Sequence, residues 1–170
     1  MARNHIVLTG AMGSGKTTSG TRLAQALGRP FFDSDAQIET THGTTGRELA
    51  ERNGVLWLHD AEAAAFSNAL ESDDPAVIAA AASIADRPDL IAALESDDLF
   101  VVLLDTDLDV LAQRAETGSH RRPVDWSDMT QRIGLRRERF ASVADVVIST
   151  TLANAGSVVA DVLAAFAERR

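Results

Sequence analysis

Cysteine is absent from the chain of 170 residues, which excludes disulfides, thiolate metal sites and cysteine nucleophiles. Long apolar runs are absent too: no stretch approaches the roughly 20 apolar residues that span a bilayer. The apolar run near the N-terminus, Ile6-Val7-Leu8, is too short for a signal peptide. We therefore expect a soluble, cytoplasmic protein with no membrane partner.

Positive charge is also scarce. The chain has 16 basic and 25 acidic residues, a formal net charge of −9, and Lys16 is its only lysine. A broad phosphate-backbone surface is therefore not expected, and neither is a nucleic-acid partner. Any anionic ligand must be held by a local group of residues, because the field of the whole protein opposes it.

Short apolar runs alternate with longer helical patterns along the whole chain. This order is typical of an α/β protein with three layers, in which helices cover both faces of a central parallel five-stranded sheet. Residues 76–82 could be strand or helix by composition, and the Asp-Pro entry and short length favour a strand. We expect residues 1–170 to form a single domain. The expected strands are 5–9, 31–33, 76–82, 99–104 and 146–148, and the expected helices are 16–27, 35–41, 45–53, 55–70, 89–94, 108–116, 127–142 and 157–169.

The segment from Gly10 to Thr17, GAMGSGKT, matches the Walker A pattern at every fixed position. Its glycines let successive backbone N–H groups turn toward phosphate oxygens, and the helix that follows adds its positive end. Lys16 would reach the β- and γ-phosphates, and the Thr17 hydroxyl would bind Mg²⁺. The alternative, a glycine-rich turn with an incidental lysine, is disfavoured because a strand precedes the motif and a helix follows it.

Several classes of nucleotide enzyme can be excluded. Guanine-specific GTPases usually carry a second lysine in an Asn-Lys-x-Asp motif, and this chain has none. It also lacks the Leu-Ser-Gly-Gly signature of transporter ATPases, and it is too short for a helicase core. A small kinase of the nucleoside-monophosphate-kinase type remains.

Further along the chain, the sequence resembles the shikimate kinase family. The resemblance begins with residues 10–17 and continues in the same order through most of the chain. It implies a P-loop kinase fold, ATP and Mg²⁺ as cofactors, and transfer of phosphate to a hydroxyl of a small metabolite. The other matching elements are 28–35 (GRPFFDSD), Ile38-Glu39, Gly43, Arg122-Pro123, Arg136 and 143–147.

Two aspartates follow the second expected strand. Asp33 would end that strand beside the phosphate loop, where its carboxylate can hold Mg²⁺ through water. Asp35 could orient the acceptor hydroxyl and accept its proton. The resemblance implies the same metal-side and acceptor-side roles. The alternative is an Asx turn that caps the next helix.

Three arginines also match the family. Arg122 lies in an expected lid at about 117–125 and can close over the γ-phosphate. The resemblance places Arg114 against adenine and gives Arg136 a grip on the acceptor's carboxylate. A solvated helix face is an equal alternative for Arg136, and it is the favoured interpretation for Arg137 and Arg139.

The departures from the family pattern gather on the acceptor side. Glu62 matches, but His59 stands where the family has a carboxylate-binding arginine, and histidine lacks its bidentate fork. Ala81-Ala82-Ser83 replaces a triple glycine, so added side-chain atoms would narrow the pocket. Ala155 stands near the position where the family pattern has a proline that packs on adenine. We expect phosphoryl transfer from ATP, with shikimate only one candidate acceptor.

These observations define the candidate site. The acceptor is expected to bind against a helical region at about 35–70, and the protein is expected to be a monomer or a weak homo-oligomer. A nucleotide-binding regulator or an inactive relative is the alternative function, and a nucleic-acid end kinase is disfavoured by the acidic composition. The candidate catalytic residues are Lys16, Asp35 and Arg122; the nucleotide-binding residues are Gly10, Ala11, Met12, Gly13, Ser14, Gly15, Lys16, Thr17, Thr18 and Arg114; the acceptor-binding residues are Asp35, His59, Glu62, Ala82 and Arg136; and the metal-side residues are Thr17 and Asp33.

Overall fold

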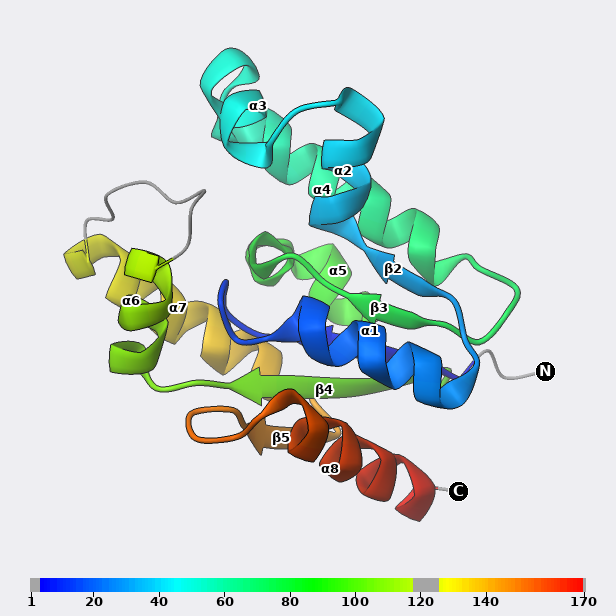
Figure 1. Cartoon of the computed structure of the whole chain (residues 1–170). Coiled ribbons are helices and arrows are strands. Elements are labelled where there is room, and N and C mark those ends of the chain that lie inside the picture. The colour runs from blue at the N-terminus through cyan, green and yellow to red at the C-terminus, as the bar shows by residue number, and fades with distance from the viewer. Residues whose placement is uncertain (1–3, 118–125, 170) are drawn as a thin grey trace.

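The computed structural model describes residues 4–117 and 126–169. Strands and helices alternate along the chain, as expected from the sequence (Figure 1). The expected lid, with Arg122, lies almost wholly outside the described residues. The elements in chain order are β1 (His5–Thr9), α1 (Lys16–Leu27), β2 (Phe31–Asp33), α2 (Ser34–His42), α3 (Gly46–Asn53), α4 (Val55–Leu70), β3 (Val77–Ala79), the 3₁₀ helix η1 (Ala82–Asp86), α5 (Pro88–Ala93), β4 (Leu99–Asp105), α6 (Leu108–Thr117), α7 (Trp126–Ala141), β5 (Val146–Ser149) and α8 (Ala155–Glu168).

The five strands form one parallel sheet in the order β2-β3-β1-β4-β5. In the register of the central pairs, Leu8 lies beside Ala79 on β3 and beside Val102 on β4. Because all strands run the same way, their carboxyl ends meet at one edge, where ligands of open α/β sheets bind. The predicted fold class is confirmed.

Helices cover both faces of the sheet. Alternate residues of β1 point to opposite sides: Ile6 and Leu8 pack toward α1 and α8, whereas Val7 packs toward α4, α5 and α7. Each face has its own apolar cluster: Phe66 of α4 is fully buried on one side, and Phe166 of α8 is largely buried on the other. These clusters hold the sheet, and thereby the loops at its carboxyl edge, in place.

Local signals set most element boundaries. Gly28 ends α1 with a left-handed φ of 62°, and Thr45 caps α3 by accepting a hydrogen bond from the Glu48 N–H at 3.2 Å. The strand expected over 76–82 is shorter than predicted. It covers Val77–Ala79, because the chain leaves the sheet and enters η1 at Ala82.

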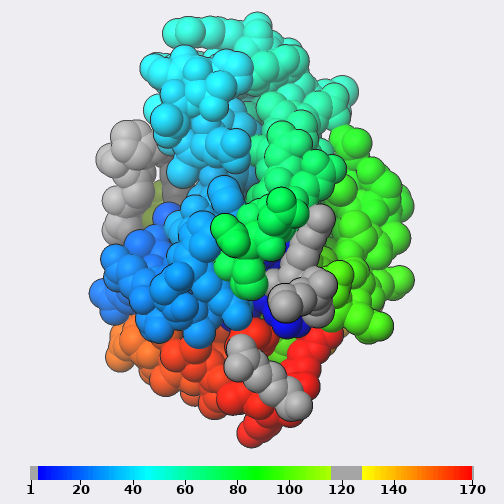
Figure 2. Space-filling model, turned by 90° about the vertical axis from the view of Figure 1, so that its right-hand side faces the viewer, coloured from blue at the N-terminus to red at the C-terminus, as the bar shows by residue number. Residues whose placement is uncertain are grey.

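Helices α2, α3 and α4 pack on one another through a separate small apolar cluster centred on Ile38, Leu49 and Ala65. Figure 2 shows α2 and α3 at one end of the molecule, away from α8 at the other end. This arrangement places the region expected to bind the acceptor above the carboxyl edge of the sheet. Within the described residues, no helix combines the length and the apolar content needed to cross a bilayer.

Candidate active site

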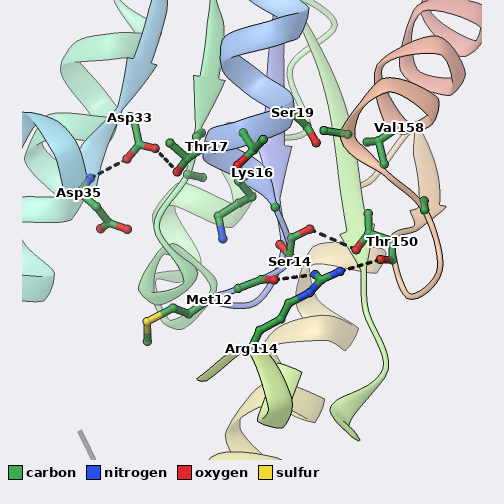
Figure 3. Close-up of a pocket in the computed structure, with 17 residues that line it drawn as sticks. Met12, Ser14, Lys16, Thr17, Ser19, Asp33, Asp35, Arg114, Thr150 and Val158 are labelled. Atoms are coloured by element: carbon green, nitrogen blue, oxygen red, sulfur yellow. Dashed lines mark hydrogen bonds between the residues drawn. The ribbon is translucent and has the colours of Figure 1, made fainter. Parts of the chain in front are cut away.

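A cavity of about 530 Å³ opens at the carboxyl edge of the sheet, around the loop between β1 and α1. Figure 3 shows Thr17, Asp33 and Asp35 on one side of this cavity and Arg114 with Thr150 on the other. All predicted nucleotide-side residues from Met12 to Thr18 line it, together with Arg114. Gly10 and Ala11, the other two, line a second cavity that adjoins this one.

The loop itself is built for close approach of a ligand to the backbone. Gly10 adopts a φ of +138°, and a Cβ there would lie 2.5 Å from the carbonyl oxygen of Leu104 and 2.8 Å from the Ser14 Oγ. Gly13 and Gly15 also have positive φ, at 88° and 95°. Among the residues that the structure describes, none offers a hydrogen-bond partner to the buried Ser14 Oγ. A tight glycine-rich turn that leads into a helix N-terminus fits the phosphate groups of a nucleotide.

Lys16, the first residue of α1, folds back over this turn. Its Nζ donates hydrogen bonds to the carbonyl oxygens of Gly10 and Ala11, each at 2.9 Å. These contacts hold the ammonium group at the mouth of the loop, and Lys16 lines both cavities. A fixed positive charge beside inward-facing amides is the arrangement that phosphoryl transfer requires.

Thr17 and Asp33 form a pair suited to a hard cation. The Thr17 Oγ1 donates a hydrogen bond to the Asp33 Oδ2 at 2.6 Å. Mg²⁺ takes one or two protein oxygens and completes its shell with phosphates and water, so this pair fits it. In the described residues, no group of three or more acidic or histidine side chains forms a separate metal cage. The pair offers one hydroxyl and one carboxylate, so nucleotide phosphates and water would supply the other ligands of a bound Mg²⁺.

Asp33 has a second role, which the sequence raised as the alternative for this element. Its Oδ1 accepts hydrogen bonds from the N–H groups of Asp35 at 3.1 Å and Ala36 at 3.2 Å, and so caps α2. One carboxylate thus faces Thr17 with one oxygen and orients α2 with the other. Because Asp35 lies in the first turn of α2, the cap also determines where the Asp35 side chain points.

Asp35 is reached by water from the open cleft, yet the surrounding walls remove part of its hydration. This desolvation raises the pKa of the Asp35 carboxyl group, and Lys16 partly opposes the rise. A carboxylate with a raised pKa is a stronger base toward a hydroxyl. Asp35 lines both cavities, so it lies at the boundary between the phosphate side and the other side of the site.

The second cavity, of about 480 Å³, lies between the α2–α4 helices and α7. All five predicted acceptor-side residues line it: Asp35, His59, Glu62, Ala82 and Arg136. Met12 joins Lys16 and Asp35 as residues shared with the first cavity. The structure therefore brings together residues from four separate stretches of the chain.

Glu62 is buried on α4, where only 8 % of its surface is exposed. Burial raises the pKa of Glu62 to about 7; the hydrogen bond donated by the Ser83 hydroxyl lowers it in part, and the nearby Asp35 charge raises it further. His59 is half-buried one turn away. Desolvation and the charge of Arg136 lower the pKa of His59, so its imidazole is neutral near pH 7.

Arg136 points into the cavity and is only 15 % exposed, which excludes the solvated-face alternative. Its Nε and Nη2 donate to the Asp86 carboxylate, the shortest contact being 2.5 Å. For Arg137 and Arg139, the sequence favoured a solvated helix face, and the structure shows that each also makes an ion pair. Arg137 makes a bidentate pair with Asp105 at 2.7 and 2.6 Å, and Arg139 contacts Asp86 at 3.2 Å, although both side chains remain about half exposed.

Arg114 of α6 reaches across the nucleotide-side cavity. Its guanidinium donates to the carbonyl oxygens of Gly13 at 2.8 Å and Thr150 at 3.1 Å, and so links the phosphate loop to the turn after β5. Thr150 was missed by the sequence analysis, although its place directly after the last strand is a signal for the carboxyl edge. Asp86 and Asp105 were missed because their partners lie 50 and 32 residues away.

Comparison with known proteins agrees with this geometry. The family model described as "Shikimate kinase" matches residues 12–167. A shikimate kinase of Symbiobacterium thermophilum is 35 % identical over 171 residues and covers 97 % of each chain. The solved shikimate kinase of Acinetobacter baumannii in complex with shikimate has a TM-score of 0.88 and 27 % identity, over 98 % of this chain and 94 % of that one. The shikimate kinase of Bacteroides thetaiotaomicron has a TM-score of 0.80 and 25 % identity, over 95 % and 97 %.

The match to the Symbiobacterium thermophilum relative covers nearly the full length of the chain, and the residues 12–167 matched by the family model hold most of the residues that line both cavities. The chain is accordingly a small-molecule kinase with ATP and Mg²⁺ as its cofactors. On the evidence of the fold, the phosphate loop and these matches together, the chain belongs to the shikimate kinase family.

Proposed function

We propose that this kinase transfers the γ-phosphate of Mg-ATP to a hydroxyl group of a small metabolite held in the second cavity. The observation that carries the proposal is the position of Asp35, which lines both cavities beside Lys16. An acceptor hydroxyl at that boundary would have a base on one side and the phosphate site on the other. The relatives named above carry shikimate in their names, which makes shikimate the first acceptor to test.

On the nucleotide side, the proposal assigns the phosphates to the loop from Gly10 to Thr17 and to the ammonium group of Lys16. Thr17 and Asp33 would hold Mg²⁺, which neutralises charge on the phosphates when bound. Thr18 and Arg114 would contact the nucleotide from the walls of the same cavity. Arg122, outside the described residues, would close over the γ-phosphate from the lid.

On the acceptor side, Asp35 would accept the hydroxyl proton as the hydroxyl oxygen forms a bond to the γ-phosphorus. The bond between that phosphorus and the bridging oxygen breaks, and ADP leaves with the electron pair. His59, Glu62, Ala82 and Arg136 would shape and orient the acceptor around Asp35. Asp35 then returns its proton to water, which completes the cycle.

The proposal includes the surroundings in which the kinase works. We take residues 1–170 as one domain that acts as a monomer or a weak homo-oligomer, without a nucleic-acid partner. The net charge of −9 supports the last point, because it repels a phosphate backbone. A cytoplasmic location is part of the proposal, since ATP and Mg²⁺ are both abundant there.

The test measures ADP release with a panel of hydroxylated acceptors that includes shikimate, and Lys16→Ala serves as the blank. We expect at least one acceptor to raise ADP release above the rate with ATP alone. In Asp35→Asn, the turnover should fall by about 100-fold or more, while calorimetry shows little change in nucleotide affinity. Tight nucleotide binding with the same slow ADP release for every acceptor would contradict the proposal and favour the nucleotide-binding regulator.

A further inference from the structure

The turn between β5 and α8 is joined to the phosphate loop by a buried residue, Thr150. It lies directly after β5, and only 3 % of it is exposed. Its Oγ1 donates a hydrogen bond to the carbonyl oxygen of Ser14 at 3.1 Å (Figure 3). Arg114 reinforces this link, because its guanidinium donates to the carbonyl oxygens of both Thr150 and Gly13. Thr150 therefore contacts the loop from a position 136 residues further along the chain.

The neighbours of the Thr150 hydroxyl determine the direction in which it donates. A hydroxyl group carries one proton and can accept two hydrogen bonds. The Asp105 carbonyl oxygen lies 3.4 Å from the Thr150 Oγ1 and already accepts the Thr150 N–H at 2.7 Å, so the Ser14 carbonyl is the better acceptor for the hydroxyl proton. The buried Thr106 hydroxyl also contacts the Thr150 Oγ1, and it is then the donor in that pair. The hydrogen bonds run from Thr106 through Thr150 to Ser14.

The Ser14 carbonyl shares a peptide unit with the N–H of Gly15. Such a unit is planar and trans, so its C=O and N–H groups point in opposite directions. A carbonyl held toward Thr150 therefore turns the Gly15 N–H away from Thr150. Thr17 lies on the opposite side of the cavity from Thr150 (Figure 3), so this N–H is directed toward the side on which the phosphates and Mg²⁺ are expected.

Other carbonyl groups of the loop are held by long side chains. The Lys16 Nζ contacts those of Gly10 and Ala11, and Arg114 contacts that of Gly13. The contact from Thr150 differs, because a buried hydroxyl on a short side chain moves little once its partners are fixed. A donor that is oriented before the ligand arrives binds an anion more tightly than one that must first turn.

We propose that Thr150 is a positioning residue for the phosphate loop: its hydroxyl, held by Thr106, orients the peptide between Ser14 and Gly15 so that the Gly15 N–H faces the phosphates of the bound nucleotide. This inference rests on the proposed kinase function and adds a residue that acts through the backbone of the loop. It does not require Thr150 to touch the reacting atoms.

The test compares Thr150→Val with the wild type, since valine keeps the shape and removes the hydroxyl. Two probes are used: Mg-ADP by calorimetry, and adenosine, which has no phosphates, by NMR titration. The affinity for Mg-ADP should fall by about tenfold, whereas that for adenosine should change by less than about threefold. A residue that only anchors the turn after β5 would weaken both ligands equally, because Ala153 and Ala155 of that segment also line the nucleotide cavity.

Three further variants make the result specific. Thr150→Ser keeps the hydroxyl and should bind Mg-ADP within about threefold of the wild type. Thr9→Val removes another buried threonine hydroxyl, which donates to the Val102 carbonyl of β4 at 3.0 Å, and it should leave Mg-ADP affinity unchanged. Thr106→Val removes the hydroxyl that holds Thr150 and should weaken Mg-ADP binding by about threefold or more, which decides the matter if Thr150→Val does not fold.

Equal weakening of both probes in Thr150→Val, or unchanged Mg-ADP affinity in Thr150→Val or in Thr106→Val, would overturn the inference. A serine variant that binds Mg-ADP as poorly as the valine variant would do the same, as would a wild type that does not bind Mg-ADP at all. The proposed kinase activity fails separately, when the wild type binds Mg-ADP but shows no acceptor-dependent ADP release with any compound.

Discussion

Glu62 provides a quantitative test of the electrostatics of the acceptor cavity. The side chain is buried on α4, accepts a hydrogen bond from Ser83 and lies beside Asp35. Replacement by glutamine keeps the shape and the contact with Ser83, and it removes the titration. The difference in the free energy of unfolding between Glu62→Gln and the wild type therefore measures how much ionisation of this carboxyl group destabilises the folded state.

The magnitude follows from the pKa of Glu62, which rises from its ordinary value of 4.5 to about 7. Below pH 4.5 the Glu62 carboxyl group is protonated in both the folded and the unfolded chain, so its ionisation does not oppose folding and the free energy of unfolding has its full value. Between pH 4.5 and 7 only the folded chain keeps the proton, and the free energy of unfolding falls as the pH rises. At about 1.4 kcal/mol for each pH unit, the total loss is about 3 kcal/mol.

The assay is urea unfolding of the wild type and Glu62→Gln at several values between pH 4.5 and 8. As the pH rises from 4.5 to 8, the free energy of unfolding of the variant minus that of the wild type should increase by about 3 kcal/mol, and most of this increase should occur below pH 7. Glu95→Gln, at an exposed position after α5, is the matched control and should follow the wild type. Parallel curves for Glu62→Gln and the wild type would refute the reasoning, because they would show that burial does not hold the proton on Glu62.

Three further substitutions test other parts of the structure. Gly10→Ala should destabilise the chain by about 2 kcal/mol or more in urea unfolding, because its φ of +138° is unfavourable for alanine and its Cβ meets a backbone carbonyl of β4. Gly28→Ala is the comparison: its φ of +62° lies in the left-handed helical region with open space around it, so it should cost less. Thr17→Val removes the hydroxyl that faces Asp33, and the magnesium concentration for half-maximal ADP release should rise about tenfold or more; an unchanged magnesium dependence would exclude Thr17 as a ligand. Phe66→Ala should lower the free energy of unfolding by about 3–5 kcal/mol, since the ring is fully buried; a loss below about 1 kcal/mol would contradict the packing described here.

The nucleotide side of the site could be anticipated because its signals are local. The phosphate loop is one contiguous segment, and the geometry that its glycines permit is a property of those residues and their neighbours. Asp33 and Asp35 could be placed at the carboxyl edge because they follow a short apolar strand. The length of β3 was overestimated, since composition alone does not show where the chain leaves the sheet.

The acceptor side could not be worked out in the same way. The sequence predicted that Arg136 and His59 belong to the site, but not that Asp86 occupies Arg136 or that Asp105 pairs with Arg137. Such ion pairs join residues that are far apart in the chain, and no periodicity or motif encodes them.

By itself the sequence determined the alternation of strands and helices, the phosphate loop and the family resemblance, because each depends on neighbouring residues or on their order. Only the tertiary structure decided the charge of the acceptor cavity, because charge there depends on which distant side chains meet and how far water is excluded from them.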